Sequence, residues 1–181
     1  MNDAHTSALL VMDVQPGIVD RVPDKDAFLK NMMQAVEHAH AQNMQVIFVV
    51  VGFRDGFPEI SARNKSFSTM NEAMRTPFIN PQPSIAPAEK DIVVTKKRVS
   101  AFSGSDLDVI LRAKGIDHLI LTGIATSGVV LSTLREAADK DYCLTVLSDL
   151  CFDGDAEVHS VLLNKVFQRQ ANVMTSGEWM K

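Results

Sequence analysis

The stretch HLILTGIATSGVVLSTLREAADKDYCLTVLSD, His118 to Asp149, contains the pattern that decides the fold. A short apolar run ends at Gly123, an amphipathic segment follows, and a second apolar run begins at Cys143. At about 100° per residue, apolar side chains of the middle segment share one helix face. They are Val130, Leu131, Leu134, Ala137 and Ala138. Val129 falls on the opposite side, with Thr133, Glu136 and Lys140. The stretch therefore predicts strand, helix and strand, and leaves Val129 off the core face.

The same alternation of apolar runs and amphipathic segments extends over the whole chain. Six runs have the length of strands: Ala8–Asp13, Gln45–Gly52, Asp91–Lys96, His118–Gly123, Cys143–Asp149 and Ala171–Thr175. Further helical segments lie at Asp26–Asn43, Ser105–Gly115 and Asp153–Gln170. Strands that alternate with helices are typical of βαβ units around a parallel sheet. We predict a Rossmann-like, three-layer α/β/α fold with a six-stranded, mostly parallel sheet.

Two helices have faces that the periodicity assigns to the core. The first carries one apolar stripe, formed by Phe28, Met32, Ala35, Val36 and Ala39. Asp24 or Asp26 is available as its N-cap. The last helix is expected to point four side chains inward: Val158, Leu162, Val166 and Phe167.

Composition limits the classes of function. The chain has 181 residues, of which 46% are hydrophobic and 22% charged, which fits a single domain over residues 1–181. A net charge of −4 without a basic run argues against nucleic-acid and membrane partners. We expect a cytoplasmic protein without a signal peptide, acting on a small molecule and associating with copies of itself. Cys143 and Cys151 lack the spacing of a zinc site and are expected to be buried structural thiols.

One crossover is much longer than the others. Residues 53–90 contain five of the seven prolines. Phe67, Met70, Asn71 and Met74 suggest a helical turn or two within this segment. A proline-rich excursion of this length predicts a lid, a pocket wall or an oligomer arm, and the alternative is a surface loop without a function.

The carboxyl ends of the predicted strands carry the candidate chemistry, because ligands bind there in open parallel sheets. Neither GxGxxG nor GxxxxGK[ST] occurs, which excludes the dinucleotide and P-loop sites that these motifs form. Asp13 ends the first strand and Lys96 ends the third. An acid and an amine on neighbouring loops can be tuned for proton transfer, and a structural ion pair is the alternative. The helix start after Gly123 adds free N–H groups for an anion or oxyanion.

Three motifs resemble the isochorismatase-like hydrolases, also called cysteine hydrolases. They are ALLVMDVQPGIV, VVTKKRVSAFSGSDLDVILRAKGIDHLILTG and GIATSGVVLSTLREAADKDY. The likeness extends from the first strand to the last helix. It implies that Asp13 is the general base or acid and Lys96 the second catalytic residue. It also implies a cis peptide at Ile124-Ala125, with an oxyanion hole that includes Thr126.

The resemblance also places the nucleophilic cysteine of that family. The corresponding position, six residues after Gly123, is Val129. A valine cannot form a thioester. Family members without the cysteine include isochorismatases, which use the aspartate as acid and water as nucleophile; they have a glycine at this place and a histidine two residues earlier. This chain has Val129 and Ser127 instead.

Other groups near this turn have more ordinary interpretations. Ser127 and Thr126 are expected to cap the helix start rather than to act as nucleophiles. The metal-binding histidines of nicotinamidases have no counterpart after the second strand, so we expect no metal and no cofactor.

The sequence therefore supports two hypotheses. The first is a metal-independent hydrolase of a small polar metabolite that uses Asp13, Lys96 and water. The candidate substrate contacts are Gln15, Arg54, Arg98 and Phe102. The second is a catalytically inactive family member that binds a ligand or serves as an oligomeric partner.

Overall fold

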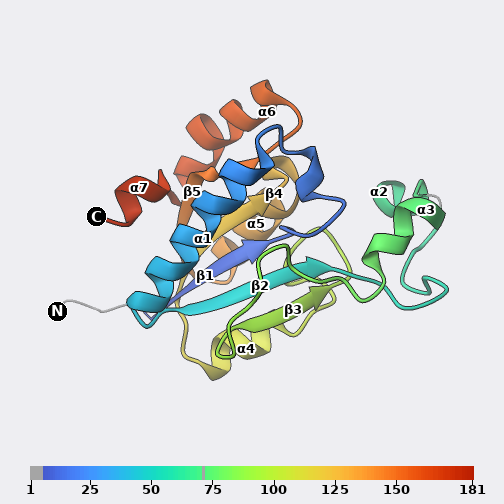
Figure 1. Ribbon diagram of the computed structural model, residues 1–181, viewed down its shortest axis with the longest axis horizontal. Coiled ribbons are helices and arrows are strands. Elements are labelled where there is room, and N and C mark those ends of the chain that lie inside the picture. Colours follow the sequence, from blue (N-terminus) through green and yellow to red (C-terminus); the bar gives the residue numbers. More distant parts are fainter. Residues whose placement is uncertain (1–5, 71) are drawn as a thin grey trace.

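A six-stranded sheet forms the centre of the protein in the computed structural model, which describes residues 6–70 and 72–181 (Figure 1). The strands are β1 (Ser7–Met12), β2 (Gln45–Val51), β3 (Ile92–Lys96), β4 (His118–Ile124), β5 (Cys143–Phe152) and β6 (Asn172–Met174). Their order is β3-β2-β1-β4-β5-β6, and every pairing is parallel. The predicted α/β fold is confirmed. The strand order reverses direction at β1, the topological switch point at which such sheets bind ligands.

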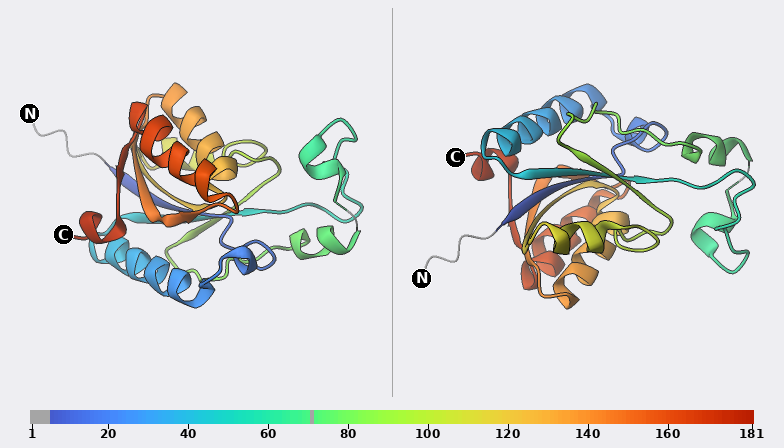
Figure 2. Two further views of the ribbon diagram at one scale, coloured as in Figure 1. Left: turned by 90° about the horizontal axis from the view of Figure 1, so that it is seen from above. Right: turned by 90° about the horizontal axis from the view of Figure 1, so that it is seen from below.

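Helices cover both faces of the sheet (Figure 2). The longer ones are α1 (Lys25–Ala41), α4 (Leu107–Ala113), α5 (Leu131–Asp139) and α6 (Ala156–Val161), and a short α7 (Ser176–Trp179) follows β6. One core cluster joins the sheet to α1, and the other joins it to α4, α5 and the segment after α6. The predicted apolar stripe of α1 is buried, and Asp24 accepts a hydrogen bond from the Ala27 N–H as its N-cap. The helices thus form the outer two of three layers.

Two expectations about individual side chains were wrong. Val158 is 38% exposed because it lies in α6, none of whose residues is buried. The buried side chains of this segment begin at Leu162, where α6 passes into a π-helical turn (Leu162–Val166) and then a 3-10 turn (Phe167–Arg169). Cys143 is exposed because it is the first residue of β5, at the rim of the sheet. Cys151 is buried, and burial raises the pKa of its thiol to about 12.

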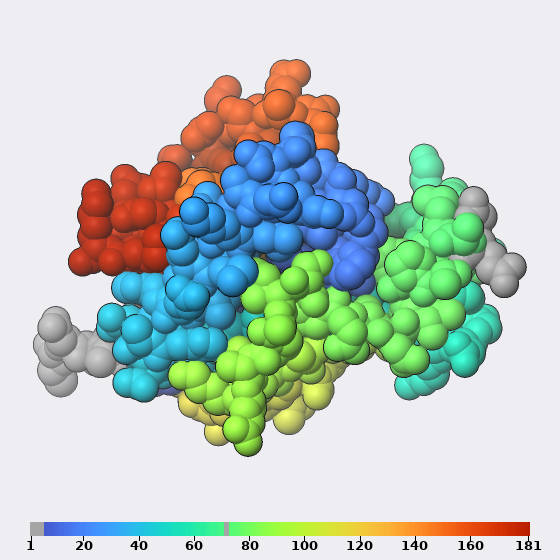
Figure 3. Space-filling model, in the orientation of Figure 1, coloured from blue at the N-terminus to red at the C-terminus, as the bar shows by residue number. Residues whose placement is uncertain are grey.

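The proline-rich crossover forms an arm, which we define as residues 53–90. It leaves the carboxyl end of β2 and projects beyond one end of the sheet (Figures 1 and 2). Figure 3 shows its outer part as a lobe at that end of the molecule. The arm contains α2 (Lys65–Ser68), α3 (Glu72–Arg75) and the 3-10 turn η2 (Thr76–Phe78); Asn71, which we assigned to a helical turn, lies outside the described residues.

Aromatic packing orders the arm. Phe53, at its base, has its ring centroid 5.5 Å from that of Phe67 and 6.4 Å from that of Phe78. These side chains belong to a third, smaller hydrophobic cluster. Ile85 on the return path joins the α1 cluster instead. The arm is therefore fixed to the body at both ends.

Candidate active site

Asp13 and Lys96 form an ion pair at the carboxyl ends of β1 and β3. The Lys96 Nζ lies 2.9 Å from the Asp13 Oδ2, and both side chains are buried. Strand β2 separates their strands in the sheet. The Lys96 side chain must therefore reach across the end of β2, and the pairing depends on the whole parallel arrangement.

The backbone at Asp13 turns its carboxyl group away from the strand. Its φ of 57° is in the left-handed region, and its N–H still donates to the Val49 carbonyl at 2.8 Å. The second oxygen, Oδ1, is buried and has no hydrogen-bond partner among the described residues. Burial raises the pKa of Asp13 to about 6, although the charge and hydrogen bond of Lys96 act to lower it. Asp13 thus has one free oxygen and can change its protonation state near neutral pH.

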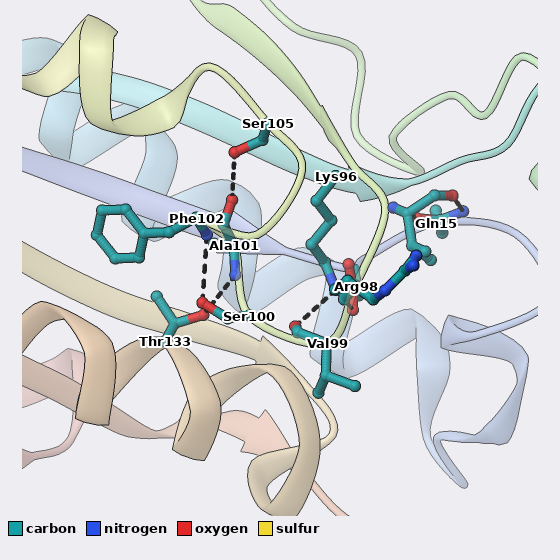
Figure 4. Close-up of polar contacts among 11 residues, drawn as sticks. Gln15, Lys96, Arg98, Val99, Ser100, Ala101, Phe102, Ser105 and Thr133 are labelled. Atoms are coloured by element: carbon teal, nitrogen blue, oxygen red, sulfur yellow. Dashed lines mark hydrogen bonds and ion pairs between the residues drawn. The ribbon is translucent and has the colours of Figure 1, made fainter. Parts of the chain in front are cut away.

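Lys96 has no proton left for a ligand. Its ammonium group donates to the carbonyl of Arg98 at 3.0 Å and to that of Val99 at 2.8 Å (Figure 4). Its third contact is Asp13. An ammonium has three donors. Lys96 therefore acts on the site through the Asp13 carboxyl group rather than by touching a ligand.

The segment after β4 approaches β1 closely. A Cβ at Gly123, whose φ is 140°, would lie 2.2 Å from the Met12 carbonyl oxygen, so only glycine fits. The peptide bond between Ile124 and Ala125 is cis, as the resemblance implies. The Ala125 N–H has no acceptor among the described residues, whereas the Gly128 N–H returns to the Ala125 carbonyl at 3.0 Å. This turn brings a free donor to the strand next to Asp13.

Val129 lies in the π-helical turn η3 (Thr126–Val130) that precedes α5. Its side chain is 2% exposed, packs within the core cluster below α5 and contributes to the cavity wall. The expectation that it points away from the core was wrong, and so was that for Thr133, whose buried Oγ1 accepts from the Ala101 N–H. The π turn changes the helical phase that a regular 100° step assumes. Neither cysteine lines the cavity.

A cavity of about 660 Å³ opens above these groups. Asp13, Lys96, Ile124, Ala125 and Val129 line it from the body. The arm closes it with apolar side chains, which are Phe53, Phe67, Met70, Met74, Pro77 and Phe78. A largely apolar cavity with a few converging polar groups is typical of small-molecule sites. The arm is thus a wall of the cavity, one of the three roles that its length predicted.

The predicted substrate contacts do not reach this cavity. Gln15 is buried and both donates to and accepts from the Val51 backbone at the end of β2. The exposed Arg54 pairs with Glu59. The Arg98 guanidinium donates to the Lys97 carbonyl, and Phe102 packs in the hydrophobic core; Figure 4 shows both residues together with Gln15.

Thr126, the remaining residue of the predicted oxyanion segment, uses its hydroxyl group for a contact within the protein. Thr126 is buried, and its Oγ1 lies 2.8 Å from the His159 Nδ1. The sequence did not suggest this partner, because His159 is far along the chain on α6. Burial lowers the pKa of His159, although the nearby Asp153 carboxylate opposes the effect.

Sequence reasoning missed Asp153, Phe152 and Arg21, which also line the cavity. The sequence held a signal for Asp153 and Phe152, because both lie at the carboxyl end of the fifth strand, and the carboxyl ends of parallel strands share one edge of a sheet. Arg21 lies in the 3-10 turn η1 (Val19–Arg21) after β1, where nothing in the sequence indicates that it faces a cavity. Within residues 6–70 and 72–181, no three His, Cys, Asp or Glu side chains come together as metal ligands would.

Comparisons with known proteins agree with this architecture. A family model described as the isochorismatase domain matches residues 7–178. The isochorismatase family protein YwoC of Bacillus subtilis (strain 168) is 32% identical, over 99% of this chain and 95% of its own. The ureidoacrylate amidohydrolase RutB of Stutzerimonas stutzeri (strain A1501) is 32% identical, over 85% of this chain and 73% of its own.

Solved structures give the same result. An isochorismatase family protein from Burkholderia thailandensis superposes with a TM-score of 0.83 and 28% identity, covering 96% of this chain and 93% of that one. The N-carbamoylsarcosine amidase of Thermoplasma acidophilum shares the fold, with a TM-score of 0.71 and 23% identity over 94% and 96% of the two chains. The described part of the chain contains no helix long and apolar enough to cross a membrane. By its motifs, its sheet and these matches, the chain belongs to the isochorismatase family of hydrolases.

Proposed function

We propose that this protein is a hydrolase of a small metabolite that uses Asp13, Lys96 and a water molecule in place of a cysteine nucleophile. The observation that carries the proposal is the free Oδ1 of Asp13. It is buried at the cavity wall, on a carboxyl group whose pKa burial raises to about 6. A structural ion pair needs no such unpaired oxygen, and leaving one buried is costly.

The roles follow from the protonation state of Asp13. Above a pKa of about 6 the carboxylate accepts a proton from water, which then attacks a carbonyl carbon. Below it the acid donates a proton instead, as cleavage of a vinyl ether requires. The free Ala125 N–H stabilises the oxygen on which negative charge develops. Lys96 is a positioning residue that keeps part of the Asp13 population ionised.

Val129 restricts the chemistry at the turn. We infer that it occupies the place of the nucleophile of the cysteine hydrolases, because it lines the cavity together with Ala125 and Asp13. With an aliphatic side chain there, no covalent acyl intermediate forms, and water is the nucleophile.

Turnover of a substrate panel tests this proposal. Amides, ureides and vinyl ethers are offered to the wild-type protein and to Asp13→Asn, which retains the shape of the side chain but cannot exchange a proton. We expect at least one hydrolysed substrate, with a rate that falls about a hundredfold or more in the variant. Asp24→Asn, a cap exchange on α1, is the matched control and should retain the rate. Turnover that survives in Asp13→Asn would contradict the proposed role.

A second function is favoured by Val129 together with the apolar arm. A family member without a nucleophile can bind a ligand in the same cavity without converting it. Binding of panel compounds by calorimetry, with no product after prolonged incubation, would select this alternative. Self-association and a cytoplasmic location remain predictions, and sedimentation velocity tests the former.

A further inference from the structure

Three neighbouring strands present polar groups to the cavity. Asp13 follows β1, the Ile124-Ala125 turn follows β4, and Asp153 follows β5. The first two belong to the proposed reaction. Asp153 has no part in it, yet its side chain contributes to the same wall.

The Asp153 carboxylate is fixed by backbone donors. Its Oδ2 accepts from the Ser127 N–H at 2.7 Å, and its Oδ1 accepts from the Asp155 N–H at 3.3 Å. Burial acts to raise the pKa of Asp153, but these hydrogen bonds outweigh it and hold the pKa below its ordinary value. Each carboxylate oxygen can accept a second hydrogen bond. Asp153 is therefore an ionised, preorganised acceptor with free capacity.

No lysine or arginine of the described residues pairs with this carboxylate, because the Lys96 ammonium is fully used by Asp13 and two carbonyls. The charge of His159 also lowers the pKa of Asp153, but burial lowers the pKa of His159 and so favours its neutral form. Arg21 also lines the cavity, but it is exposed and has no fixed partner within residues 6–70 and 72–181. An exposed, flexible charge is screened by water and contributes less to recognition than a fixed one.

We propose that Asp153 is a ligand-binding residue that selects small molecules with a positively charged nitrogen group, such as an ammonium, at one end. The other end lies near Asp13 and Ala125, and the aliphatic stem packs against the apolar wall. The inference rests on the proposed function in one respect, which is that this cavity is the ligand site. What it adds is that the cavity prefers cationic ligands to anionic ones.

The test is a binding experiment that does not require turnover. Three probes share one primary amide and one chain length: hexanamide, its analogue with an ammonium in place of the terminal methyl group, and adipamate. Calorimetry gives the dissociation constant of each for the wild-type protein and for Asp153→Asn, whose amide oxygen can still accept from the Ser127 N–H. The matched control is Asp155→Asn, because Asp155 caps α6 and does not line the cavity.

We expect the wild-type protein to bind the ammonium probe at least about tenfold more tightly than hexanamide, as one charge-assisted hydrogen bond provides. Asp153→Asn should bring this ratio close to one, and Asp155→Asn should leave it unchanged. An unchanged ratio in Asp153→Asn, or no binding of the ammonium probe in the millimolar range, would overturn the inference. So would a preference for adipamate that Arg21→Gln abolishes.

Hydrolysis of hexanamide separates this inference from the proposed function. Asp155→Asn should retain that activity if the wild-type protein has it, whereas Asp13→Asn should lose it. If the wild-type protein hydrolyses none of the probes or panel compounds, the proposed function fails, and the ratio of dissociation constants still decides the role of Asp153.

Discussion

The protonation of Asp13 makes the stability of this protein depend on pH in an unusual direction. Most carboxyl groups in folded proteins have lowered pKa values, and they stabilise the fold at pH values above those pKa values. Asp13 has a pKa of about 6 in the folded state and 3.8 as a reference, so the folded state binds the proton more tightly than the unfolded chain. Asp13 therefore stabilises the fold fully below pH 3.8, and this stabilisation is lost as the pH rises through about 6.

The size of the loss follows from the two pKa values. They differ by about 2 pH units, and each unit corresponds to about 1.36 kcal/mol, so the loss is ~3 kcal/mol. Asp13→Asn removes this titration. We expect the free energy of unfolding of the wild-type protein, minus that of the variant, to fall by ~3 kcal/mol between about pH 3 and pH 7.

Urea denaturation at a series of pH values measures this difference. The ¹³C chemical shift of the Asp13 carboxyl carbon reports its titration directly. In Lys96→Gln both contributions that lower the pKa are absent, so the loss should be larger and extend to higher pH. A difference that stays constant with pH, or that increases with it, would refute the argument that burial controls Asp13.

Three further outcomes are expected. Gly123→Ala should lower the melting temperature by many degrees, because its Cβ would meet the Met12 carbonyl at 2.2 Å, whereas Gly177→Ala, with open space around it, should not. Phe53→Ala should cost about 3 kcal/mol and make the arm sensitive to limited proteolysis, while an unchanged cleavage pattern would show that other contacts hold the arm. Val129→Cys should react with iodoacetamide faster than Cys151, whose pKa burial raises to about 12; equal rates by peptide mass analysis would argue against a reactive position at Val129.

Local pattern was enough to predict much of the fold. The central strands β1, β2 and β4 are buried on both sides and are therefore nearly continuous apolar runs, which can be recognised in the sequence alone. The apolar stripe of α1 can be recognised in the sequence in the same way, because each helical turn places an apolar side chain on the same buried face. Where the helix changes pitch, as at Val129, the same rule assigned the side chain incorrectly.

The candidate site was predictable only in part. The motifs indicated Asp13, Lys96 and the turn at Ala125, because each of them ends a strand at a recognisable place. Gln15, Arg54, Arg98 and Phe102 also follow strands or flank them, but their side chains turn elsewhere. Residue type and position along the chain do not fix the direction in which a loop side chain points.

The sequence by itself determined the strands, the helices, the parallel sheet and the residues that end its strands, because these depend on repeating local patterns of polarity. Only the tertiary structure decided which side chains meet. The contact of Lys96 with Asp13 across β2, the free oxygen of Asp13 and the closure of the cavity by the arm all result from packing between segments far apart in the chain. Burial, which raises the pKa of Asp13, is likewise a property of the assembled protein, because it depends on how much water the surrounding segments exclude.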